Sequence, residues 1–186
     1  MTDLLISSVL MFTSVWVILT DLFYRRIHNI LIVGLLLGWC GIAILSFWSV
    51  GPYSNIHSGD LLSYLGYSIA GAAGVLIVGF GLFLIGQMGA GDVKLMSVLC
   101  LWVGYDNQLV FLVVTALVGG MLALLMPVLS LLEIAGAKVI VQISSRFPRL
   151  KIPAPLVFSR EGVKGLPYGL AISGGAFYLL ISPFSH

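Results

Sequence analysis

Long apolar runs separated by short polar breaks constrain this chain more than any other feature of its sequence. A helix of about 20 residues crosses a hydrocarbon core of roughly 30 Å, and five of the six runs approach that length. Apolar residues make up 60% of the 186 residues and charged residues only 9%, which excludes an ordinary soluble domain. We therefore predict an all-α, polytopic integral membrane protein with six transmembrane helices, in which residues 1–186 form a single membrane-embedded domain. The six runs are Leu4–Thr20, Ile30–Trp48, Leu61–Gly86, Leu95–Gly104, Leu109–Leu132 and Leu166–Ile181.

The basic residues alternate between the polar breaks and predict an orientation. Lys and Arg remain in cytoplasmic loops, whereas short acidic loops do not decide topology. Arg25 and Arg26 follow the first run, Lys94 follows the third, and six further basic residues follow the fifth. Segments 49–60 and 105–108 contain neither Lys nor Arg. We therefore expect both termini on the outer side and three connecting loops in the cytoplasm.

The fourth run is too short to cross a bilayer unaided. Even if its helix begins at Asp92, thirteen residues rise only about 20 Å, at about 1.5 Å each. We expect this helix to tilt little, to thin the bilayer or to begin inside a polar cavity. Removing this crossing would move the six basic residues after the fifth run to the outer side, so six crossings are favoured over five.

Small residues spaced four apart predict close packing between the helices, because they let two backbones approach. The pairs are Ala70 and Gly74, Gly119 and Ala123, and Gly169 and Ser173.

Two carboxylates stand at the ends of apolar runs. Asp21 closes the first run and Asp92 follows the third, so the predicted topology places both at the cytoplasmic face, at the same depth and on different helices. Two adjacent carboxylates do not both ionise cheaply, so one keeps a proton while the other acts as a base. Such a pair activates a water between them and titrates as a unit. This is the arrangement that an aspartyl protease needs.

The residues around Asp92 admit two interpretations. Gly89 and Gly91 free the backbone to leave helical geometry beside a substrate strand. Lys94 would steer an acidic group near the new terminus of the substrate or hold an active-site carboxylate ionised. Alternatively, Asp92 is the N-cap of the next helix and Lys94 is a positive-inside anchor. For Asp21 the alternative is a solvated boundary residue paired with Arg25, four positions along.

The longest segment outside the runs indicates contact with membrane lipids. Residues 139–150 mix apolar side chains with Arg146 and Arg149, which suits a segment lying along an anionic surface, with docking of the substrate as the alternative. The net charge of +2 gives no indication of nucleic acid. Cys40 and Cys100 lie inside apolar runs without metal-ligand spacing, so neither a disulfide framework nor a metal site is indicated.

Three blocks of the sequence together resemble the prepilin peptidases, which are aspartyl proteases of the GxGD type. The blocks are 21–29, 89–95 and 164–172, in the order the family has them, and His28 stands where proline is usual. The resemblance is narrower to the short CpaA or TadV-like members that serve tight-adherence and Flp pili. It implies Asp21 and Asp92 as the catalytic pair, supported by Gly89, Gly91, Lys94, Arg25, Asn29, Lys164, Pro167 and Tyr168.

The resemblance also implies the reaction and its setting. The expected substrate is a prepilin or pseudopilin with a short basic leader, a glycine just before the cut and an apolar helix after it. The expected location is the bacterial inner membrane, with the active site facing the cytoplasm and no cofactor or metal. Larger relatives carry an additional domain with CxxC pairs and also N-methylate the product, so we expect this chain to be a peptidase without a methyltransferase domain. The sequence does not indicate an oligomeric state.

Two other functions compete with this interpretation. A small proton-coupled transporter also carries acidic residues within its helices, but neither aspartate is at a helix midpoint and no inverted repeat is evident. A pilus assembly subunit without enzymatic activity is the second alternative. Cleavage of a prepilin by the purified protein separates the three.

The predicted topology is testable by cysteine labelling in intact cells. Single cysteines at Ser54 and Asn107 are expected to react with a membrane-impermeant reagent from the outer side, because the segments that contain them carry no basic residue. A cysteine at Ser159 is expected to react only after the cells are opened. Labelling of position 107 from the cytoplasm would contradict the six-helix arrangement.

Overall fold

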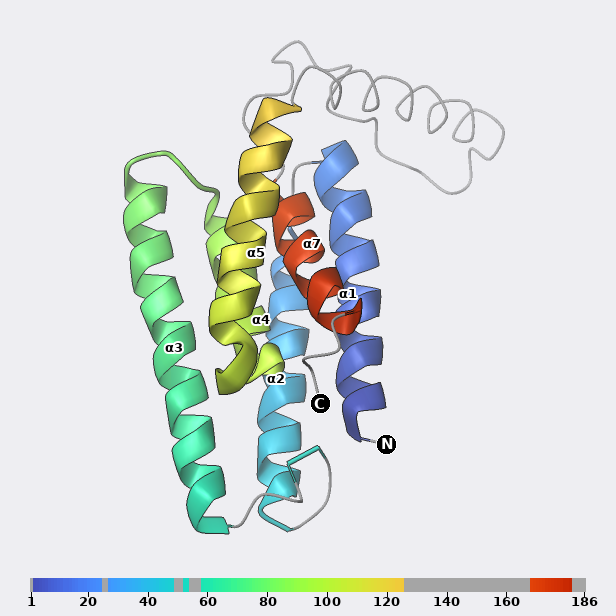
Figure 1. Cartoon of the computed structure of the whole chain (residues 1–186), viewed down its shortest axis with the longest axis vertical. Coiled ribbons are helices and arrows are strands. Elements are labelled where there is room, and N and C mark those ends of the chain that lie inside the picture. The colour runs from blue at the N-terminus through green and yellow to red at the C-terminus, as the bar shows by residue number, and fades with distance from the viewer. Residues whose placement is uncertain (1, 25–26, 49–51, 54–57, 126–167, 182–186) are drawn as a thin grey trace, which may run out of the picture.

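The described part of the chain is helical, as the sequence predicts. The computed structural model describes residues 2–24, 27–48, 52–53, 58–125 and 168–181, and these residues contain six helices (Figure 1). The segment expected to lie along the membrane surface falls outside the described residues. The helices are α1 (Thr2–Tyr24), α2 (Asn29–Ser46), α3 (Ser58–Leu84), α4 (Ala90–Val103), α5 (Tyr105–Leu124) and α7 (Tyr168–Ile181).

Four of these helices, α1, α2, α3 and α5, are long and apolar enough to cross a membrane, and α7 is a shorter apolar helix. Their outward faces carry large apolar side chains. On α3, for example, Ile77 is 72% exposed and Val78 is 66% exposed. Surfaces of this kind are unfavourable in water but match the acyl chains of a bilayer. The protein is therefore a multi-pass membrane protein.

Successive helices run in opposite directions, so alternate connections meet at the same end of the bundle. Helices α1 and α3 finish, and α2, α4 and α7 begin, at the upper end in Figure 1. We call this the carboxylate end, because Asp21 lies in the last turn of α1 and Asp92 in the first turn of α4. The first turns of α3 and α5, which carry Asp60 and Asp106, lie at the opposite end.

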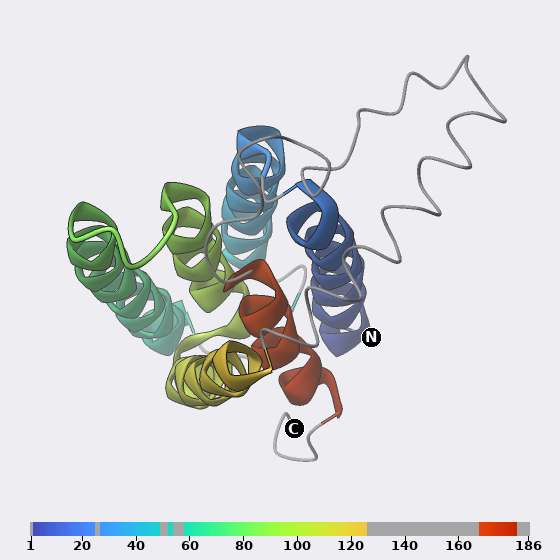
Figure 2. The same cartoon turned by 90° about the horizontal axis from the view of Figure 1, so that it is seen from above.

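Helix α4 contacts every other described helix. Its 14 residues include eight that are buried, so most of its surface touches protein rather than lipid. The indole Nε1 of Trp102 donates a hydrogen bond of 3.0 Å to the carbonyl of Leu35, which fixes α2 against α4. Helix α7 lies among α1, α4 and α5 (Figure 2), and the Ser173 hydroxyl donates to the carbonyl of Ser14 at 3.3 Å.

Helix α4 ends in a one-residue turn that is covered by protein. Gly104 has φ 78° and ψ 160°, a backbone conformation open almost only to glycine, and α5 begins at the next residue. The Tyr105 amide donates to the Ser68 hydroxyl at 3.0 Å. The Gln108 side-chain amide donates to the carbonyls of Ser68 and Cys100. These hydrogen bonds satisfy polar groups that lipid could not, and α2 and α3 extend beyond the turn in Figure 1.

This turn explains how a helix of 14 residues fits in a membrane protein. At about 1.5 Å per residue, α4 is about 21 Å long, well short of a hydrocarbon core of roughly 30 Å. Because its neighbours surround it, α4 itself does not have to match the thickness of the lipid.

Replacing Gly104 with alanine is expected to destabilise the protein by about 1–3 kcal/mol, because alanine adopts this backbone conformation only with strain. The added methyl group would also overlap the Tyr64 hydroxyl. Thermal unfolding in detergent measures the effect. Gly120→Ala is the control, since a side chain there meets nothing within 4 Å. Equal stability of the two variants would show that the turn does not need glycine.

Candidate active site

Asp21 is held between α1 and α7 in the last turn of α1. Its side chain is only 5% exposed. A Cβ atom added to Gly169, at the start of α7, would lie 2.8 Å from the Asp21 Oδ2 atom and 2.9 Å from its Cβ atom. The missing side chain at Gly169 therefore makes room for this carboxylate. The C-terminal end of a helix carries partial negative charge, so this position gives an ionised carboxylate no help from the helix dipole.

Asp92 lies near the N-terminal end of its helix, whereas Asp21 lies near a C-terminal end. It is the third residue of α4 and is half-buried. The N-cap of α4 is Gly89, with φ −75° and ψ 145°, so the alternative interpretation of Asp92 as the N-cap is wrong. Glycine caps helices nearly as well as threonine does, so the aspartate is not required as the cap. The partial positive charge at a helix N-terminus favours a negative charge at this position.

The two glycines of the second block, Gly89 and Gly91, leave little room for a side chain in the turn that carries Asp92. A Cβ atom on Gly89 would lie 2.6 Å from the Asp92 Oδ2 atom, so a side chain there would displace the carboxylate. A Cβ atom on Gly91 would lie 3.2 Å from the Cβ atom of Ile27, in the connection between α1 and α2. The first block of the sequence is therefore packed directly against the second.

Asp21 and Asp92 thus lie at the same end of the bundle, on two helices that are in contact with each other and with α7. This placement agrees with the prediction that the two carboxylates lie at the same side of the bundle on different helices. One carboxylate is buried against a helix, and the other is half-buried in the first turn of a helix. A pair with such different surroundings is suited to divide the roles of acid and base.

The residues expected to support this pair are placed less uniformly. Lys94 is exposed on α4, and Asn29 is exposed as the first residue of α2. Tyr168 is half-buried as the first residue of α7, next to the glycine that contacts Asp21. The remaining three, Arg25, Lys164 and Pro167, lie outside the described residues. The suggested pairing of Asp21 with Arg25 lies outside them for the same reason.

Two contacts at this end were not anticipated from the sequence. One is the contact of Gly169 with Asp21, although the spacing of Gly169 and Ser173 did mark α7 as a helix that packs closely. The other is the contact of Ile27 with Gly91. Both join residues that are far apart along the chain, and no local pattern encodes such a pairing.

Comparison with known proteins gives one match. A model of the type IV leader peptidase family matches residues 8–124, which include both aspartates and all of α2, α3, α4 and α5. Neither the curated proteins nor the solved structures contain a significant match.

Gly169→Ala is expected to lower the stability of the protein by about 1–3 kcal/mol, the usual cost of overpacking a helix contact. The added methyl group would press on the Cβ atom of Asp21, which does not swing aside as the tip of a side chain does. Gly119→Ala, on α5 facing α7, is the matched control, because its Cβ would meet Ala171 at an ordinary 3.5 Å. Thermal unfolding in detergent compares the two. An equal or smaller loss for Gly169→Ala would contradict the packing described for Asp21.

Proposed function

The chain belongs to the type IV leader peptidase family, and on that premise we propose that it is an aspartic endopeptidase that removes the leader of prepilins or pseudopilins. Asp21 and Asp92 are the catalytic pair in this proposal. The observation that carries it is the placement of the two aspartates at one end of the bundle, on contacting helices, within the residues that match the family. Their surroundings give each a separate role.

In the proposed reaction Asp92 is the base and Asp21 the acid. Asp92 lies in the first turn of α4, where the helix dipole favours a negative charge, and Asp21 lies in the last turn of α1, where the dipole gives a negative charge no support. A water between them gives a proton to Asp92 while its oxygen attacks the carbonyl carbon of the scissile peptide. The Asp21 proton neutralises the developing oxyanion. The tetrahedral intermediate then collapses: Asp92 gives its proton to the amide nitrogen, Asp21 takes a proton back from a hydroxyl of the intermediate, and the C–N bond breaks to leave a carboxylic acid and an amine.

The cytoplasmic face is the proposed side of cleavage. The support is the distribution of Lys and Arg in the sequence: all nine follow the first, third or fifth apolar run, on the side that the predicted topology gives to Asp21 and Asp92. A prepilin inserted in the same bilayer, with its basic leader in the cytoplasm, would present its cleavage site at that face. The substrate and the carboxylates would then meet at one depth without extraction of the substrate from the membrane.

Asp21→Asn and Asp92→Asn are each expected to reduce cleavage by about 10²–10⁴-fold, because an amide neither accepts the proton of water nor donates one at a useful pKa. The double variant is expected to be no slower than either single variant, since groups that act as a unit lose most of their effect together. The measurement is removal of the leader from a purified prepilin by each variant in detergent. Near-normal cleavage by Asp92→Asn would exclude the mechanism.

Two aspartates at the opposite end provide matched controls. Asp106 occupies the first turn of α5, as Asp92 occupies the first turn of α4, and Asp60 occupies the first turn of α3. Both are exposed. Asp60→Asn and Asp106→Asn are expected to cleave normally, so the same change in helix-end charge is tested with and without access to the substrate.

A further inference from the structure

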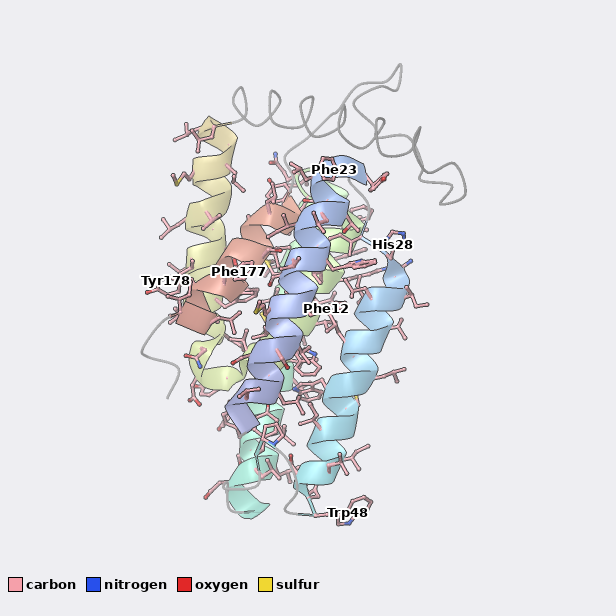
Figure 3. All side chains as sticks on the ribbon, turned by 90° about the vertical axis from the view of Figure 1, so that its right-hand side faces the viewer. Phe12, Phe23, His28, Trp48, Phe177 and Tyr178 are labelled. Carbon is pink, nitrogen blue, oxygen red and sulfur yellow. The ribbon has the colours of Figure 1, made fainter. Side chains whose placement is uncertain are left out.

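Helices α1 and α2 follow one another in the sequence but pack on different neighbours. Helix α1 packs mainly on α7, and α2 packs on α4. Between α1 and α2 lies a groove of about 690 Å³. Figure 3 shows Phe12 on α1 beside α2, and His28 at the start of α2. The groove is therefore a lateral opening in the bundle, formed by the two helices that the first sequence block connects.

The surface of this groove is mainly apolar. On α1 the rings of Phe12 and Trp16 are stacked, with centroids 6.3 Å apart, and both line the groove. On α2 the groove is lined by Leu31 and by Gly34, where a side chain would meet nothing within 4 Å. Gly34 thus leaves open a space that most other residues would fill.

The groove is continuous with the carboxylate end. His28 lines it, and the preceding residue, Ile27, contacts Gly91 beside Asp92. From His28 to Gly34 the groove descends about 9 Å into the bundle, at about 1.5 Å per residue. Asp21 itself faces α7, and the groove-lining residues of α1 lie on another face of that helix. A chain that leaves the groove at His28 would pass Ile27 and reach the turn that carries Asp92.

We propose that this groove binds the apolar helix that follows the scissile bond of the substrate. The inference rests on the proposed function, because a leader peptidase substrate has its apolar helix directly after the bond that is cut. Such a helix needs an apolar recess that opens toward the lipid and reaches the catalytic pair. The groove has both properties: its walls are apolar, and its His28 end adjoins the turn that carries Asp92.

Disulfide crosslinking tests this placement. The enzyme carries Cys40→Ala, to remove the exposed native thiol, Asp92→Asn, to keep the substrate uncut, and Gly34→Cys. The probe is a purified prepilin with single cysteines in its apolar helix. Because Gly34 lies six residues beyond His28, we expect crosslinks within about the first two turns after the cleavage site, recurring every three or four positions. Gly74→Cys on α3 is the control. The close packing expected at Gly74 from the sequence is wrong, since Gly74 is exposed and has no neighbour within 4 Å, and we expect no crosslinks there.

A bulky side chain in the groove gives a second, kinetic test. Gly34→Trp is expected to lower kcat/KM for the prepilin at least about tenfold, mainly through KM, because it occupies the site of the substrate helix. Gly74→Trp is expected to cleave normally. Thermal unfolding of both variants checks that they are folded.

The outcomes separate this inference from the proposed function. If the unsubstituted protein does not cut the prepilin, the proposed function fails and the inference fails with it. If the protein cuts the prepilin, but Gly34→Cys gives no crosslink and Gly34→Trp cleaves normally, only the groove assignment is overturned, and lipid occupies the groove. Crosslinking of Gly34→Cys to a second copy of the enzyme in the absence of prepilin would also overturn it.

Discussion

Backbone polar groups inside a membrane must find hydrogen-bond partners within the protein. In this fold the requirement matters most for α4. It is short, largely buried and in contact with all the other described helices. At its C-terminal end, Ser68 and Gln108 satisfy the groups around the turn to α5. At its N-terminal end the cap is a glycine, which supplies no side-chain hydrogen bond. The first amides of a helix have no carbonyl acceptor within that helix, and in α4 they belong to the same turn as Asp92.

The sequence predicted the parts of this protein that depend on local chemistry. The lengths of the apolar runs anticipated the helices, and the short fourth run anticipated α4. The family-like blocks correctly indicated the family, and the alternation of basic residues placed Asp21 and Asp92 at one end of the bundle. Each of these features is a property of residues close together in the chain, so a pattern in the sequence reports it directly.

The features that escaped prediction depend on which helices become neighbours. Asp92 and Gly89 are both acceptable N-caps, and only the packed structure decides between them. Gly169 makes room for a residue in the first helix of the chain, which no local spacing encodes. The groove beside Gly34 exists because α1 and α2 pack on α7 and α4 rather than on each other. No pattern in the sequence indicates that two consecutive helices will pack on other neighbours.

The contact between Asp21 and Gly169 also has a consequence for biosynthesis. Asp21 belongs to α1, which leaves the ribosome before α7, the last described helix and the one that carries Gly169. At about 5–20 residues per second, the roughly 150 residues between them take about 8–30 s to synthesise. Throughout that interval α1 is in the membrane without the helix that buries its carboxylate. The carboxylate end is therefore completed only when α7 inserts, and a nascent chain that stops earlier holds Asp21 without the helix that buries it.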